Sequence, residues 1–257
     1  MRFLGNVLAT VIGIFVFMML SFFGIILIGV IFGGDSETVE VENNSVIELN
    51  LSDISDDYAG KYSDPWVTAF SERKKIGLTD VINAIEIAET DDAIKGISIL
   101  NTNSSLGMAQ SKELRDALNR FKKSGKFIYS YANNYSQKEY YLNSVATSIY
   151  INPIGELDFK GLSTEVMFFK DFQEKSGLKM EVIRHGKYKS AVEPFLENKM
   201  SDANKEQTMA LLNGIWTNIV EDISKSRNIP VEKLNTIANG LLARTPEMAK
   251  AQNLIDY

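Results

Sequence analysis

Lys189 is the side chain whose type and setting best suit acid–base chemistry. It lies in a mostly apolar stretch, Tyr188–Phe195, three residues after Gly186. A lysine among apolar neighbours loses the hydration that stabilises its ammonium form, so its neutral amine can accept a proton from a serine hydroxyl. The same lysine could instead pair with Glu193, four residues further on, and remain a charged surface group. The residues alone leave both interpretations open.

Other common nucleophiles and bases are scarce in this chain. It has no cysteine and a single histidine, His185. Thiol catalysis is therefore excluded, and a zinc site built from cysteine and histidine is disfavoured. A serine–histidine–aspartate triad would have to use His185. The sequence places no acidic residue to orient this histidine, so we interpret it as a surface or packing residue.

The N-terminal segment predicts a membrane anchor. No charged residue occurs from Val7 to Phe32, and this run exceeds the ~20 residues that span a bilayer. The run is also longer than the apolar core of a cleavable signal, and no Ala-x-Ala site follows it. A long signal peptide cleaved near Gly33 is the alternative. Arg2 precedes the run, which favours a cytoplasmic N-terminus and a main domain across the membrane.

The charge of the remaining chain argues against polyanionic partners. Beyond the apolar run there are 26 basic residues (all of the 27 except Arg2) and 33 acidic ones, giving a formal charge of −7. A domain of this charge is a poor candidate for binding nucleic acid or anionic lipid headgroups. We therefore expect no nucleic-acid partner.

The globular part alternates short apolar strands with amphipathic helices, which predicts an α/β domain with parallel strands. We divide the chain into an anchor (1–33), a polar linker (34–45) and one domain (46–257). The expected strands are 46–51, 94–100, 127–131, 148–151 and 180–183. A long loop is expected to follow the first strand.

The helices of this domain are expected from apolar periodicity and from cap signals. The predicted helices are one capped by Thr79, 109–123, 137–145, one carrying Val166, Phe169 and Phe172 that ends at Gly177, and two beginning at Ser201 and Thr245.

The segment around Lys189 resembles the lysine motif of the signal peptide peptidase A family, which are membrane-bound serine–lysine proteases. The similarity covers Gly186 and Tyr188–Phe195, continues to Ser201, and extends more weakly from about Val46 to the C-terminus. It is to the N-terminal half of the family's long, tandem-repeat form, in which the first half supplies the lysine and the second half supplies the serine. The resemblance implies that Lys189 is the general base, that the serine lies in a second half, and that the fold is crotonase/ClpP-like.

The resemblance also implies a function and a location. It identifies a serine endopeptidase that degrades cleaved signal peptides or other peptides at the membrane, without a metal ion or organic cofactor. Family members form ring- or dome-shaped homo-oligomers. The expected location is the bacterial inner (plasma) membrane, with a single helix in the bilayer and the main domain on the periplasmic, extracytoplasmic side.

Ser136 lies where a nucleophile of this family would be, but its surroundings differ from the family pattern. No glycine follows it, and the loop from Asn101 to Gly107 has one glycine where two are expected beside an oxyanion. Glu139 follows Ser136 by three residues, which is the pattern of a capping box, so we interpret Ser136 as a helix N-cap. Three alternatives stay open: a stand-alone protease using Ser136 and Lys189, a non-catalytic membrane scaffold, and a crotonase-type acyl-CoA enzyme.

Overall fold

The computed structural model describes residues 2–32, 41–58, 76–183, 185–186 and 188–257. Residues Met1–Val41 and Glu42–Tyr257 form two compact units. Within the first unit, α1 (Arg2–Phe32) includes a segment, Arg2–Ile28, that is long and apolar enough to cross a membrane. This helix is consistent with the predicted anchor, although a secretory signal satisfies the same criterion. Residues 34–40 of the predicted linker lie outside the described residues.

The second unit is built on a parallel sheet with the strand order β1-β4-β5-β6. Its strands are β1 (Ser45–Asn50), β4 (Ile94–Asn101), β5 (Phe127–Ala132) and β6 (Ser148–Ile151). A shorter parallel pair joins β2 (Ile54–Asp56) to β3 (Ile76–Gly77). Parallel neighbours need crossover connections, and helices α3 (Leu78–Thr90), α4 (Met108–Lys123) and α5 (Gln137–Asn143) provide them between successive strands. The predicted α/β class is confirmed.

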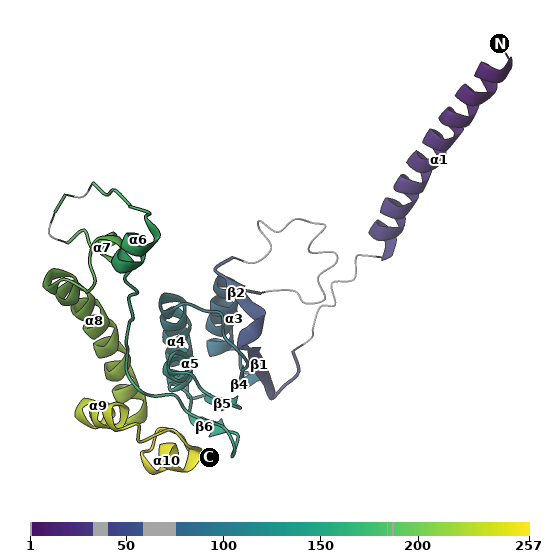
Figure 1. Cartoon of the computed structure of the whole chain (residues 1–257). Coiled ribbons are helices and arrows are strands. Elements are labelled where there is room, and N and C mark those ends of the chain that lie inside the picture. Colours follow the sequence, from purple (N-terminus) through teal and green to yellow (C-terminus); the bar gives the residue numbers. More distant parts are fainter. Residues whose placement is uncertain (1, 33–40, 59–75, 184, 187) are drawn as a thin grey trace. The chain divides into compact units, whose positions relative to one another are not determined.

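Helices α3, α4 and α5 lie along the strands, and the C-terminal helices follow them in the chain (Figure 1). The helices are α3 (Leu78–Thr90), α4 (Met108–Lys123), α5 (Gln137–Asn143), α6 (Lys170–Ser176), α7 (Glu193–Leu196), α8 (Asp202–Arg227), α9 (Val231–Gly240) and α10 (Pro246–Ala251), with a 3-10 turn at Leu51–Asp53.

The core lies between the helices and one face of the sheet. Ile97 and Ile99 of β4 are fully buried, as are Leu114, Leu118 and Phe121 of α4. The three α4 residues are spaced at i, i+4 and i+7, so they share one face of the helix. Burial of apolar side chains on this helix face and on alternate strand positions fixes the register of the sheet.

Most of the predicted elements are confirmed, within two residues at their ends, and so are the N-caps of α8 and α10. The side chains of Ser201 and Thr245 accept hydrogen bonds from backbone N–H groups in the first turns of these helices. The predicted cap at Thr79 is wrong, because α3 begins one residue earlier, after Gly77, and has no side-chain cap. The long loop expected over residues 52–75 is wrong at Ile54–Asp56, where β2 forms, and residues 59–75 of it lie outside the described residues.

Two predictions for residues 162–183 are wrong. The helix expected to carry Val166 begins only at Lys170, although it ends at Gly177 as predicted. Residues 180–183 form no strand: Met180 is half-exposed and Ile183 is fully exposed. An apolar segment without a neighbouring strand has no ladder of hydrogen bonds to join, so β-propensity alone does not make it a strand.

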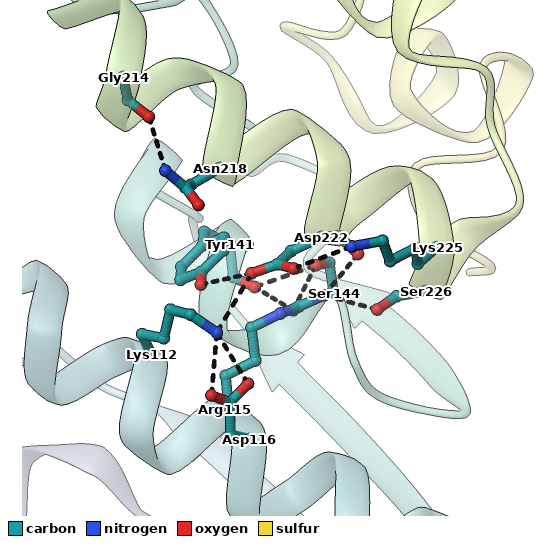
Figure 2. Close-up of polar contacts among 10 residues, drawn as sticks. All are labelled: Lys112, Arg115, Asp116, Tyr141, Ser144, Gly214, Asn218, Asp222, Lys225 and Ser226. Carbon is teal, nitrogen blue, oxygen red and sulfur yellow. Dashed lines mark hydrogen bonds and ion pairs between the residues drawn. The ribbon is translucent and has the colours of Figure 1, made fainter.

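Arg115 of α4 ties three helices together (Figure 2). Its buried guanidinium donates hydrogen bonds to the Tyr141 carbonyl and the Ser144 hydroxyl at the end of α5, and to the Asp222 carbonyl and the Ser226 hydroxyl on α8. It also lies over the Tyr141 ring, 4.9 Å from the centroid. Burial lowers the pKa of Arg115, opposed by nearby Tyr141 and Asp222, and a guanidinium of such high intrinsic pKa stays charged.

Loss of the Arg115 guanidinium should destabilise the fold strongly. Arg115→Met keeps the volume but removes four hydrogen bonds, two of them buried bonds to the Tyr141 carbonyl and the Ser144 hydroxyl, so the free energy of unfolding should fall by about 3 kcal/mol. Arg120→Met is the matched control, because Arg120 forms a surface ion pair with Glu86 and should cost less than about 1 kcal/mol. Urea unfolding monitored by circular dichroism measures both; equal costs would contradict the assigned role of Arg115.

Candidate functional site

Lys189 belongs to a segment that we call the lysine arm, residues 162–200, of which residues 184 and 187 are not described. Helices α6 and α7 of this arm are held together locally. The N–H group of Phe169 donates to the Pro194 carbonyl (2.6 Å), and the amide of Gln173 donates to the Phe195 carbonyl (2.7 Å). The rings of Phe169 and Phe195 stack with centroids 5.8 Å apart. The two short helices therefore form one folded element.

Glu193 attaches the lysine arm to α8. Its carboxylate is buried and accepts hydrogen bonds from the Ser201 hydroxyl (2.5 Å), the Ser201 N–H group (3.2 Å) and the Asn204 amide (2.9 Å). Ser201 is the N-cap of α8, so a carboxylate lies at the positive end of this helix. This contact fixes the arm just after Lys189.

Lys189 itself is exposed. It lies in a turn after Gly186, which adopts a positive φ of 105°, and no regular helix or strand includes it. Within the part of the chain that the structure describes, its side chain forms no ion pair or hydrogen bond. The alternative pairing with Glu193 is not found, because α7 begins only at Glu193 and the two residues do not share a helix face. The apolar neighbours of Lys189 in sequence do not bury it in this chain.

An apolar hollow lies on the same arm, formed by α6, the residues after it and α7. Its volume is about 400 Å³, and it is lined by Phe169, Phe172, Gln173, Leu178, Lys179, Met180 and Phe195. Phe172 and Leu178 are each about two-thirds exposed. Exposed apolar side chains on a concave surface are typical of a surface that binds another peptide segment.

Ser136 is the N-cap of α5, as predicted. Its hydroxyl accepts a hydrogen bond from the Glu139 N–H group (3.3 Å), and its own N–H group donates to Glu139 Oε2 (3.0 Å). The hydroxyl also donates to Glu139 Oε2 (2.7 Å). A serine in this arrangement provides a hydrogen-bond acceptor for a backbone N–H group in the first turn of a helix, and it is not paired with a lysine base.

Glu139, on α5, also contacts the loop after β4, where the resemblance would place an oxyanion donor. Its second oxygen, Oε1, accepts a hydrogen bond from the N–H group of Ser104 (3.2 Å) in the loop after β4. The nearby ammonium of Lys138 donates to the Leu106 carbonyl (2.5 Å). The carboxylate of Glu139 therefore accepts hydrogen bonds from the backbone N–H groups of both Ser104 and Ser136. Those donors are not available to a developing oxyanion.

The structure thus does not bring together the candidate residues that the sequence suggested. Lys189 is on the exposed arm, Ser136 is engaged by Glu139, and no hydrogen bond joins them among the described residues. His185 is exposed in the same turn as Lys189. The described residues contain no cluster of three or more histidine, aspartate or glutamate side chains that could hold a metal ion.

Two contacts of this region were not anticipated. The capping box was visible in the Ser136–Glu139 spacing, but the bond from Ser104 to Glu139 joins residues 35 positions apart and has no local signal. The sequence suggested Lys189 as the partner of Glu193, so the contact of Glu193 with Ser201 and Asn204 was not predicted. A glutamate eight residues before an N-cap serine carries no recognised motif.

Comparisons with known proteins support a protease family. Residues 120–257 match the family model described as "Peptidase family S49". The chain is 36% identical to "Protease 4" of Haemophilus influenzae over 220 residues, covering 82% of this chain and 35% of that protein. It is 31% identical to "Serine protease SPPA, chloroplastic" of Arabidopsis thaliana over 199 residues, covering 77% of this chain and 28% of that protein. The chain spans about a third of the length of these relatives.

A solved structure of a membrane-bound stomatin-specific protease, in complex with a substrate peptide, aligns with 83% of this chain and 74% of its own. Its TM-score is 0.40 and its sequence identity 12%, values too low to bear on the fold or the function. The family assignment depends instead on the sequence model, which covers more than half of the chain, including both Ser136 and Lys189. On that match the chain belongs to peptidase family S49.

Proposed function

We propose that this chain is part of a membrane-anchored serine endopeptidase of the signal peptide peptidase type, in which Lys189 is the general base. The nucleophilic serine would come from a second half outside this chain. The observation that carries the proposal is the contrast between two side chains. Lys189 is exposed and has no described partner, whereas the hydroxyl of Ser136 is engaged by Glu139.

The proposed chemistry follows from a lysine amine next to a serine hydroxyl. When the second half covers the arm, its apolar surface would remove water from Lys189 and favour the neutral amine. The amine then accepts the serine proton as the serine oxygen attacks the peptide carbonyl, and the resulting ammonium donates a proton to the leaving amine. The oxyanion donors would also have to come from the second half, because Glu139 engages the N–H group of Ser104.

The exposed apolar surface of the arm supports apolar peptides as substrates. A hollow lined by Phe172, Leu178 and Met180 could hold an apolar side chain, with Lys179 at its margin. Cleaved signal peptides are rich in such side chains. With α1 as an anchor, the proposed enzyme would act at the bacterial inner membrane from its extracytoplasmic side, as a homo-oligomer and without a metal ion or cofactor.

The second candidate function is that of a non-catalytic membrane scaffold. The engagement of Glu139 with Ser136 and Ser104 favours it, since this chain then keeps the fold of a peptidase without a free nucleophile. The peptidase requires the amine of Lys189 as a base, whereas the scaffold does not. The same contacts argue against a stand-alone protease that uses Ser136.

Substitution of Lys189 separates the two functions. In the enzyme assembled with the half that supplies the serine, Lys189→Ala should lower kcat by ~10²–10⁴, the effect of losing an acid–base group. Lys189→Arg should be similarly impaired, because arginine keeps the charge but remains protonated. Lys199→Ala, at an exposed lysine of the same arm, is the control and should leave kcat unchanged. Near-normal cleavage by Lys189→Ala would favour the scaffold.

The chain alone should show no turnover of a signal-peptide-like substrate, because Ser136 serves as a cap. Ser136→Ala should leave this background unchanged but reduce the free energy of unfolding by about 1 kcal/mol, as for other lost N-caps. Ser136→Thr, which preserves a hydroxyl that can accept from the Glu139 N–H group and donate to its carboxylate, should retain most of the stability. Robust cleavage by the chain that Ser136→Ala abolishes would establish Ser136 as the nucleophile instead.

The proposed orientation places residues 42–257 outside the cytoplasm. Protease added to spheroplasts should therefore digest this domain and leave a membrane-protected fragment containing α1. Adding an excess of positively charged residues after Phe32 should weaken this orientation, since basic residues are retained on the cytoplasmic side. A domain that is digested only after the membrane is broken would show the opposite orientation.

A further inference from the structure

Glu193 is the one buried residue among the described residues of the lysine arm. It is 2% exposed, whereas every other described residue of the arm is exposed or half-buried. This part of the chain therefore has no apolar core of its own, and a carboxylate takes the place of a core side chain. Burying a carboxylate costs more free energy than burying an apolar group of similar size, so stability alone does not account for it.

Three donors converge on the Glu193 carboxylate. The Ser201 hydroxyl donates to Oε1 (2.5 Å), and the Ser201 N–H group (3.2 Å) and the Asn204 amide (2.9 Å) donate to Oε2. The Asn204 amide is itself oriented, because its oxygen accepts from the Thr208 hydroxyl (3.3 Å). Both carboxylate oxygens are thus held in one direction. We call Glu193, Ser201 and Asn204 the glutamate clamp.

The backbone transmits this fixed direction toward Lys189. The N–H group of Glu193 donates to the Ser190 carbonyl (3.0 Å), which closes a turn over residues 190–193. This turn begins directly after Lys189. On the other side, the N–H group of Lys189 is 3.5 Å from the Gly186 carbonyl, at the limit of a hydrogen bond. The clamp therefore supports the Lys189 backbone from its C-terminal side.

The clamp lies far from the core contacts of α8. The buried apolar residues of this helix are Ile219, Val220 and Ile223, and the first of them lies 15 residues beyond Asn204. At ~1.5 Å per residue, this is about 22 Å along the helix. The contacts of Arg115 lie in the same C-terminal part of α8. Opening the clamp should therefore release the arm without unfolding the sheet domain.

We infer that Glu193 is a positioning residue for Lys189, because the clamp fixes the turn that presents the lysine amine to the serine. This inference rests on the proposed function, in which Lys189 is the general base and the serine comes from outside this chain. A base accepts a proton efficiently only when its nitrogen is about 2.6–3.2 Å from the hydroxyl oxygen. A displacement of about 1 Å can cost 10²-fold in rate. Directional hydrogen bonds to a carboxylate suit this requirement better than apolar contacts, which have no preferred direction.

The clamp does not form part of the apolar hollow of the arm. None of its three residues lines this hollow. The walls of the hollow are held by contacts between α6 and α7, through Gln173 and through the Phe169 and Phe195 rings. Loss of the clamp should therefore affect the chemical step more than the binding of substrate.

Asn204→Asp tests the clamp with a small change of shape. At about pH 8, above the usual range of carboxyl pKa values, it places a second carboxylate against Glu193 and should open the clamp. In the enzyme assembled with the half that supplies the serine, kcat should fall about 10²-fold while KM changes less than about threefold. Asn198→Asp adds the same charge at an exposed residue of the arm and should leave both constants unchanged.

An exchanged pair tests the direction of the hydrogen bond. Glu193→Gln supplies an amide that can donate to the carboxylate introduced at position 204. The double variant Glu193→Gln/Asn204→Asp should therefore recover most of the lost kcat. Glu197→Gln combined with Asn204→Asp is the matched control, because Glu197 is exposed and outside the clamp, and it should give no recovery.

A positioning residue acts only through the residue that it positions. Asn204→Asp should therefore have no further effect on kcat in a Lys189→Ala background. A general structural defect would instead lower the residual rate of Lys189→Ala again.

Hydrogen exchange of the full chain in detergent micelles tests the clamp without catalysis. Asn204→Asp should speed exchange of the amides within residues 189–201, because the turn and α7 lose their support. The amides of β4 and α4 should keep their protection, which would show that the sheet domain remains folded.

The outcomes separate the positioning role from the proposed function. Near-normal kcat in both Lys189→Ala and Asn204→Asp would overturn the proposed function, and the positioning role with it. A large loss in Lys189→Ala with near-normal kcat in Asn204→Asp would overturn the positioning role alone. Unchanged exchange over residues 189–201, equal losses in Asn198→Asp, or no recovery in the exchanged pair would also overturn it.

Discussion

The buried guanidinium of Arg115 is the interaction on which the rest of the domain depends. It binds carbonyl oxygens at the last turns of α5 and α8, where the helix dipoles favour a positive charge. A buried charge without partners would be costly, so α4, α5 and α8 hold it only when all three are in place. The 26-residue α8, about 39 Å long, is thereby fixed at its C-terminal end. Its other end carries Ser201 and Asn204, which bind Glu193 and so position the lysine arm.

These contacts fix the chain at Glu193, four residues after Lys189, although the turn of Lys189 itself is exposed. Glu193 is fastened to α8, and α8 is fastened to the helices on the sheet. Only Ser190, Ala191 and Val192 lie between Lys189 and Glu193. A partner that covers the arm would meet a segment already attached to the sheet domain next to Lys189, which would reduce the entropy lost on forming the proposed site.

The sequence predicted the central domain well because local signals and global packing agree there. The α4 spacing of Leu114, Leu118 and Phe121, followed by Gly125 with its positive φ, defines a helix without reference to other segments. The same agreement is missing at residues 180–183, where apolar residues predict a strand but no strand pairs with them among the described residues. It is also missing at Lys189 and Glu193, whose spacing suits a helix that does not form. Long-range contacts such as Ser104 with Glu139 have no local signature at all.

The role of Ser136 as a helix cap was predictable from its spacing to Glu139 and is confirmed, whereas the role of Lys189 as a base stays a prediction. Nothing local indicated that Glu139 would also reach the Ser104 N–H group. That contact bears on which catalytic groups this chain could supply. A tetrahedral intermediate carries its negative charge on an oxygen that needs free N–H donors, and a fixed carboxylate on those donors would repel it. In the function that we propose, the nucleophile and the oxyanion donors come from outside this chain, and this chain contributes the amine that moves the proton.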